Sequence, residues 1–164
     1  MKLPKTNAMR ILDQAGVNYE VRYYEYDDQD LSGVKAARML DLPPAQVYKT
    51  LVAQGDKSGF LVCCLPVDLE IDLKSLAVLS GNKRVELIPQ KDLLPLTGYL
   101  RGGCSPFGMK KKWPAYLDEA ALLQARIAVS GGQRGCQVLL EPSDLIRCVD
   151  AKCGPVSRLP ADKV

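Results

Sequence analysis

Apolar positions in this chain recur with helical spacing in some segments and run together or alternate in others. Ala8, Ile11, Leu12 and Ala15 follow the three- and four-residue spacing of a helix that buries one face. Serine and aspartate favour helix starts, and glycine commonly follows helix ends. The helices we expect cover residues 4–15, 33–41, 73–80, 90–94 and 142–146, with Ser32 and Asp72 as caps and Gly16 and Gly81 as stops.

Apolar and aromatic segments without helical spacing lie between these helices and predict strands. Residues 47–54 and 60–65 flank the turn sequence Gly55-Asp56-Lys57-Ser58-Gly59, which predicts an antiparallel hairpin. The strands we expect cover residues 19–26, 47–54, 60–65, 84–87, 115–118, 126–130, 136–140 and 147–150. Many short strands with few helices, in no regular βαβ order, predict an α/β fold of the α+β type, with a mixed, barrel-like sheet surrounded by helices.

Length and composition indicate one globular domain over residues 1–164, with 47% apolar and 25% charged residues. The net charge of +3 is small for a protein that binds nucleic acid mainly through phosphates, so any such contact is expected to be local. No apolar run is long enough to cross a membrane, and the first residues lack a signal-peptide core. We therefore expect a cytoplasmic protein with no membrane partner.

The cysteine and histidine counts limit the possible chemistry. Six cysteines without a signal peptide predict reduced, mostly buried thiols, and the absence of both histidine and a C-x-x-C pair disfavours zinc. We expect no metal and no cofactor. The absence of histidine also rules out Ser-His-Asp and Cys-His nucleophile activation. An enzyme of this sequence would depend on carboxylates, a lysine, backbone dipoles or its substrate.

Lys49 is the first candidate functional residue. Because side chains alternate along a strand, Lys49 shares a face with Val47, Leu51 and Ala53, where an ammonium group needs a partner or a polar cavity. One interpretation is a lysine that points into a binding pocket toward an anionic or carbonyl group. The alternative is a lysine near the end of the strand that extends to water.

Two glycine-rich segments are the next candidates. Arg101-Gly102-Gly103-Cys104-Ser105-Pro106-Phe107-Gly108 contains adjacent glycines, which allow positive φ and close approach of a ligand to backbone N–H groups. Ser130-Gly131-Gly132-Gln133-Arg134-Gly135 follows a predicted strand and matches no phosphate-binding motif. Ordinary surface and hairpin loops are the alternatives for both.

Two charged stretches are open to different interpretations. Lys110-Lys111-Lys112-Trp113 could contact phosphates and stack on a base, or could be a solvated run beside a core tryptophan. Asp68, Glu70 and Asp72 alternate, and we interpret them as solvated or capping residues rather than metal ligands.

Three motifs in a characteristic order carry a family resemblance. They are Val47-Tyr48-Lys49-Thr50-Leu51, the segment from Gly102 to Gly108 and the segment from Ser130 to Gly135. With the N-terminal Lys5-Thr6-Asn7-Ala8, the chain resembles the YbaK/EbsC family from about residue 4 to 150. That family comprises the free-standing relatives of the editing domain of bacterial prolyl-tRNA synthetases.

The resemblance implies an aminoacyl-tRNA deacylase with a mixed, barrel-like sheet. The YbaK branch acts on Cys-tRNA(Pro) and Cys-tRNA(Cys) at the acceptor end and has prolyl-tRNA synthetase as partner. There the thiol of the substrate is thought to attack the ester and leave as a thiolactone, which would explain how the reaction proceeds without histidine. Alternatives are a deacylase for another aminoacyl-tRNA such as Ala-tRNA(Pro), and a non-catalytic regulatory or binding protein on the same fold.

The same resemblance implies roles for individual residues. Backbone N–H groups near two of the glycines would stabilise the oxyanion, the lysine would hold a phosphate or another polar group, and Cys104 would be incidental. The implied catalytic residues are Lys49, Gly102, Ser130 and Gly132, and the implied substrate-binding residues are Tyr24, Thr50, Gly103, Ser105, Gly131 and Arg134. The chain departs from the family at Gln137, where relatives often have aspartate, and this leaves the amino-acid preference open.

Overall fold

Side-chain caps fix where three of the helices begin in the computed structural model, which describes residues 4–161. Thr6 is extended and its hydroxyl accepts a hydrogen bond from the Met9 N–H at 3.2 Å, so the first helix starts after Thr6 rather than at Pro4 as expected. Ser32 and Asp72 cap the next two α-helices as predicted. These helices are α1 (Asn7–Gln14), α2 (Gly33–Met39) and α3 (Leu73–Ser80).

The remaining helical segments are short. They are α4 (Leu93–Thr97), α5 (Pro142–Val149) and the 3₁₀ turns η1 (Pro44–Gln46), η2 (Gln90–Asp92) and η3 (Glu119–Leu123). The strand predicted over 147–150 is wrong, because α5 continues through these residues and ends where Asp150 takes a left-handed conformation with φ of 55°. Cys148 and Val149 pack on the core from this helix, which explains why their apolar character resembled a strand.

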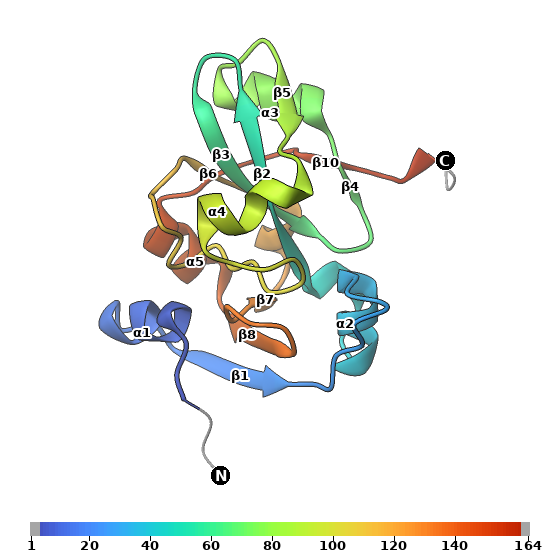
Figure 1. Ribbon diagram of the computed structural model, residues 1–164, viewed down its shortest axis with the longest axis vertical. Coiled ribbons are helices and arrows are strands. Elements are labelled where there is room, and N and C mark those ends of the chain that lie inside the picture. The colour runs from blue at the N-terminus through green and yellow to red at the C-terminus, as the bar shows by residue number, and fades with distance from the viewer. Residues whose placement is uncertain (1–3, 162–164) are drawn as a thin grey trace.

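The strands form a five-stranded sheet, a three-stranded sheet and a two-stranded pair (Figure 1). They are β1 (Tyr19–Tyr23), β2 (Tyr48–Gly55), β3 (Gly59–Pro66), β4 (Glu70–Ile71), β5 (Val85–Leu87), β6 (Ala115–Asp118), β7 (Ile127–Ser130), β8 (Cys136–Leu140), β9 (Lys152–Gly154) and β10 (Ser157–Arg158). The strand orders are β5-β2-β3-β6-β9, β1-β8-β7 and β10-β4. The β3–β6 and β6–β9 pairs are parallel and the others antiparallel, so the mixed sheet is confirmed, as is the β2–β3 hairpin.

Within residues 4–161 the strands do not close into a barrel. The two larger sheets meet at a single parallel bridge between Val47 and Ala128. β1 ends at Tyr23 instead of residue 26, because its partner β8 begins at Cys136, directly opposite Tyr23. Residues 24–26 therefore leave the sheet and are free to line a cavity beside it.

The core lies on both faces of the β2–β3 hairpin. One apolar cluster joins α1 and α5 to β7 and β8 and includes the fully buried Phe107 and Leu117. A second cluster lies between the hairpin and α3. None of the helices in the described part of the chain is long and apolar enough to cross a membrane. The predicted domain range of 1–164 includes residues 1–3 and 162–164, which lie outside the described residues.

Asn82 ties the end of α3 to the β2–β3 turn, and its replacement should lower stability. Its side-chain oxygen accepts from the N–H groups of Lys57 and Ser58, both at 2.9 Å, and its amide nitrogen donates to the Ser80 hydroxyl at 2.8 Å. We expect Asn82→Ala to lower the free energy of unfolding by about 2 kcal/mol, because it leaves part-buried N–H groups unpaired. Urea denaturation measures the change, with the exposed Gln54→Ala as control. A loss no larger than that of the control would contradict this role.

Candidate functional site

A cavity of about 460 Å³ opens beside the first residues of β2, and we call it the lysine cavity. The strand alternation and the two glycine-rich loops bring separate parts of the chain to its wall. Five of the residues singled out in the sequence line it together: Tyr24, Lys49, Thr50, Gly102 and Ser130. Five of the ten predicted site residues therefore line the same cavity.

Lys49 is half-buried and held at the cavity wall by the backbone. Its Nζ donates a hydrogen bond to the Leu69 carbonyl oxygen at 2.6 Å. Burial lowers the pKa of the Lys49 ammonium, and the charges of Asp68 and Glu70 oppose that shift. An ammonium has three N–H donors, so a group within the cavity can accept those that Leu69 does not use. Of the two interpretations of Lys49, this geometry favours the pocket.

Both charged residues that line the lysine cavity are cationic. They are Lys49 and Arg101, and no carboxylate belongs to the lining formed by the described residues. With the Gln90 amide oriented to accept, its oxygen lies 2.7 Å from Arg101 Nε. Arg101 was not among the predicted site residues, although its position next to Gly102 in the sequence was the available signal. Two cations in a lining that contains no carboxylate suit an anionic ligand or a polarised carbonyl.

The two loops offer different hydrogen-bond donors from those expected. The Gly132 N–H donates to the Ser130 hydroxyl oxygen at 3.1 Å, so this amide is already used. Ser130 thereby keeps its own hydroxyl proton to donate into the lysine cavity. Gly102, at φ of 84°, lines the cavity, and its N–H donates to no group among residues 4–161. The available donors are therefore the Gly102 N–H and the Ser130 hydroxyl.

Gln137 adds an unpaired acceptor to the lysine cavity. It lies opposite Ser130 across the β7–β8 pair and is only 6% exposed. Its Oε1 has no hydrogen-bond partner in the described protein. A buried acceptor without a partner is costly and commonly marks a place where another molecule binds. The sequence analysis noted Gln137 only as a departure, and its pairing with Ser130 was not visible from spacing.

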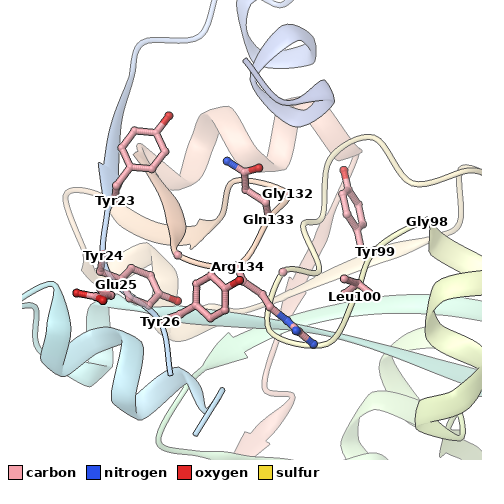
Figure 2. A pocket seen from close by; sticks show the side chains of 12 residues that line it. Tyr23, Tyr24, Glu25, Tyr26, Gly98, Tyr99, Leu100, Gly132, Gln133 and Arg134 are labelled. Atoms are coloured by element: carbon pink, nitrogen blue, oxygen red, sulfur yellow. The ribbon is translucent and has the colours of Figure 1, made fainter. Parts of the chain in front are cut away.

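A second cavity, of about 650 Å³, adjoins the first, and we call it the tyrosine cavity (Figure 2). Four predicted site residues line it: Tyr24, Gly103, Gly132 and Arg134. Tyr24 lines both cavities, and Arg134 Nε donates to the Arg101 carbonyl at 2.8 Å, which ties the second loop to the first. The predicted site is thus divided between two neighbouring cavities.

Three predicted site residues either lie outside both cavity linings or have a buried side chain. Ser105 is fully buried outside both linings, and its hydroxyl accepts from the Phe107 N–H at 3.2 Å. Gly131 also lies outside both linings. Thr50 lines the lysine cavity, but its hydroxyl lies 3.5 Å from the Cys64 sulfur and is buried.

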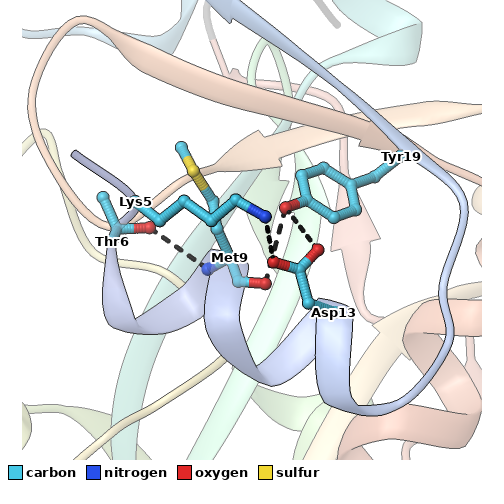
Figure 3. Close-up of polar contacts among 5 residues, drawn as sticks. All are labelled: Lys5, Thr6, Met9, Asp13 and Tyr19. Atoms are coloured by element: carbon cyan, nitrogen blue, oxygen red, sulfur yellow. Dashed lines mark hydrogen bonds and ion pairs between the residues drawn. The ribbon is translucent and has the colours of Figure 1, made fainter. Parts of the chain in front are cut away.

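The segment before α1 makes polar contacts with that helix (Figure 3) and with the second glycine loop. The Thr6 hydroxyl donates to the Gly131 carbonyl at 2.6 Å while it caps α1. Lys5 pairs with Asp13, whose carboxylate also accepts from the Tyr19 hydroxyl at 2.9 Å. The Thr6–Gly131 bond holds the loop that follows Ser130 against the start of α1.

Neither Trp113 nor Cys104 is expected to act on a ligand in the two cavities. Trp113 packs on Phe60, with ring centroids 5.3 Å apart, and lines neither cavity. Cys104 lines the lysine cavity, but burial raises the pKa of its thiol to about 12, so it remains protonated. All six cysteines are free and four are buried, in agreement with the sequence analysis.

Comparison with known sequences assigns a family to this fold. Residues 31–148 match a family model described as "Aminoacyl-tRNA editing domain". The chain is 42% identical over 153 residues to a protein of Enterococcus faecalis named "Putative Cys-tRNA(Pro)/Cys-tRNA(Cys) deacylase EbsC", and the match covers 93% of each chain.

Solved structures support the same fold. A hypothetical protein superposes with a TM-score of 0.85 at 20% identity, covering 93% of this chain and 100% of the other. A structure described as "a putative trans-editing enzyme for prolyl tRNA synthetase" superposes with a TM-score of 0.81 at 23% identity, covering 95% and 99%. At these identities the superpositions establish the fold alone.

Proposed function

Because the chain belongs to the aminoacyl-tRNA editing domain family, we propose that it removes a misattached amino acid, cysteine in the first instance, from the acceptor end of tRNA(Pro). The observation that carries the proposal is the lysine cavity, where both charged lining residues are cationic and where Gly102 and Ser130, which have donors to spare, belong to the lining. An ester joined to a phosphate-bearing adenosine has the complementary charge. The 42% identical relative bears a deacylase name for this substrate.

In the proposed reaction the nucleophile arrives with the substrate. The cysteinyl thiol loses its proton to solvent and its sulfur attacks the ester carbonyl carbon. A C–S bond forms, the bond from the carbonyl carbon to the ribose oxygen breaks, and that oxygen takes a proton from solvent. The products are a thiolactone and free tRNA. For an amino acid without a thiol, water would take the place of the sulfur.

The protein contributes charge and position to this reaction. The Gly102 N–H and the Ser130 hydroxyl would donate to the developing oxyanion, and such a donor is commonly worth about 3 kcal/mol. Lys49 and Arg101 would hold the phosphate or the ester oxygens. Holding thiol and carbonyl in reacting geometry supplies an orientation advantage without any general base. These roles account for activity in a chain that has no histidine.

A panel of charged tRNAs tests the proposal. The wild-type protein should deacylate Cys-tRNA(Pro) and Cys-tRNA(Cys), and should act far more slowly on 2-aminobutyryl-tRNA(Pro), in which a methyl group of similar size replaces the thiol. Equal rates on both would point to water as nucleophile, and preference for Ala-tRNA(Pro) would change the amino acid assigned. No release from any of them would favour a non-catalytic binding role.

The expected partners follow from the same proposal. A net charge of +3 gives little general attraction for tRNA, so prolyl-tRNA synthetase is the proposed source of additional tRNA affinity. Addition of the synthetase should lower the KM for Cys-tRNA(Pro). The cytoplasmic location stays a prediction.

Gln137→Leu should separate activity from stability. Removal of a buried acceptor that lacks a partner costs the folded protein little, so we expect the free energy of unfolding to change by about 1 kcal/mol or less. Deacylation should nevertheless fall, about tenfold in kcat/KM, because the lysine cavity would lose a polar lining group opposite Ser130. Chemical denaturation and initial rates measure the two effects, with Gln137→Glu as the matched acceptor-retaining variant. A parallel loss of both quantities would contradict the assignment.

A further inference from the structure

The proposed reaction leaves the tyrosine cavity without a role. It is larger than the lysine cavity, at about 650 Å³ against 460 Å³. Four tyrosines line it, and two of them have large exposed fractions, 47% for Tyr23 and 46% for Tyr26. Figure 2 shows Tyr23 and Tyr99 on opposite sides of the group, with Gln133 between them. Exposed aromatic rings gathered around one hollow indicate a binding surface.

The ring of Tyr26 lies against the second glycine loop. A Cβ added at Gly135 would lie 3.0 Å from the Tyr26 Cδ1 and 2.6 Å from the Tyr24 carbonyl oxygen, so glycine permits this close packing. The contact holds one part of the ring against the backbone, while nearly half of the side chain stays exposed. A ring held in this way loses little conformational entropy when a flat ligand stacks on it.

The tyrosine cavity adjoins the lysine cavity. Tyr24 lines both, and the adjacent Gly102 and Gly103 line the lysine and the tyrosine cavity respectively. A chain molecule whose reacting end lies beside Lys49 would therefore reach the tyrosine cavity by passing Tyr24 and the first glycine loop.

The charge around the tyrosine cavity suits a polyanion. Arg134 lines it and lies 3.9 Å from the exposed Asp28, and the stem of the exposed Lys110, whose Nζ donates to the Pro95 carbonyl, passes 3.5 Å from where a Cβ on Gly98 would lie. Glu25 is the one acidic residue of the lining within the described chain, and Figure 2 shows its carboxylate pointing away from Tyr99 and Gln133. Aromatic faces beside cationic side chains are the usual combination for unpaired nucleotides.

We infer that the tyrosine cavity binds the unpaired nucleotides that precede the aminoacylated terminal adenosine of the RNA, with a base stacked on Tyr26 and their phosphates near Arg134 and Lys110. The inference rests on the proposed function, since it takes the ester to lie in the lysine cavity. A second macromolecule such as a protein would not require a path between the two cavities.

Two substrates of different length test the inference. The first is Cys-tRNA(Pro), and the second is the 3′-cysteinyl ester of adenosine, which lacks the preceding nucleotides. We expect Tyr26→Ala to raise the KM for the tRNA about tenfold, as one lost stacking contact would, and to raise it by a much smaller factor for the adenosine ester. Tyr26→Phe, which keeps the ring, should retain the wild-type ratio of the two KM values. Leu123→Ala, at an 86% exposed residue outside both linings, is the matched surface control.

A binding measurement separates failure of the inference from failure of the proposed function. The trinucleotide cytidylyl-cytidylyl-adenosine, titrated into the wild type and Tyr26→Ala, should bind the variant about tenfold more weakly. Equal affinity, or equal effects of Tyr26→Ala on the two ester substrates, would overturn the inference while deacylation by the wild type still stands. If the wild type cleaves neither ester, the proposed function fails, and the trinucleotide result alone decides whether the cavity binds nucleotides.

Discussion

Replacement of Lys49 by methionine is expected to lower kcat/KM for Cys-tRNA(Pro) deacylation by about a hundredfold to a thousandfold. The change removes one of the two cations that line the lysine cavity but keeps a long apolar stem in its place. Loss of a single charged or dipolar donor at a reacting carbonyl commonly has an effect of this size. Initial rates with limiting substrate measure it.

The fold should survive the loss of Lys49. Its ammonium makes one hydrogen bond, to the Leu69 carbonyl, and burial already lowers its pKa, so a neutral side chain should cost about 1 kcal/mol or less in the free energy of unfolding. Lys57→Met, on the exposed hairpin turn, is the control for loss of positive charge. Near-wild-type deacylation by Lys49→Met would remove the basis of the proposed mechanism.

Phe107→Ala should give the largest loss of stability, about 3–5 kcal/mol in the free energy of unfolding. Phe107 is 1% exposed and anchors the end of the first glycine loop in the main apolar cluster. Its carbonyl accepts from the Tyr99 hydroxyl, so a collapse of the loop would also move a wall of the tyrosine cavity. Urea denaturation followed by circular dichroism measures the change.

Leu123→Ala is the matched control for Phe107→Ala, because it also truncates a large apolar side chain but at an 86% exposed site. We expect it to lower the free energy of unfolding by about 0.5 kcal/mol or less. A loss for Phe107→Ala of about 1 kcal/mol would mean that the loop is not anchored through this ring.

Local interactions explain the part of the fold that could be predicted from the sequence. The caps at Ser32 and Asp72, the stop at Gly81 and the hairpin between β2 and β3 depend on contacts between residues close in the chain. The position of Lys49 beside a cavity also followed from a local property, the alternation of side chains along a strand.

Contacts between segments that are far apart in the chain explain where the structure differs from the sequence-based predictions. Apolar residues of α5 that pack on the core resembled a strand, and β1 is shortened by where β8 begins. The use of the Gly132 N–H by Ser130, and the place of Gln137 opposite Ser130, depend on how two strands pair. The division of the site into two cavities depends on Tyr24 leaving the sheet, which no spacing in the sequence encodes.

The burial of the thiols affects how easily a reactive product could acylate the protein's own cysteines. A thiolactone is an acylating agent, and the one released in the lysine cavity would form next to Cys104. Burial raises the pKa of this thiol to about 12 and those of Cys64 and Cys136 to about 11, so at neutral pH these side chains are protonated and weakly nucleophilic. If the proposed reaction takes place in this cavity, the protein would thereby resist covalent modification by the thiolactone, and a thiol-directed covalent inhibitor would gain little from reaching the same cavity.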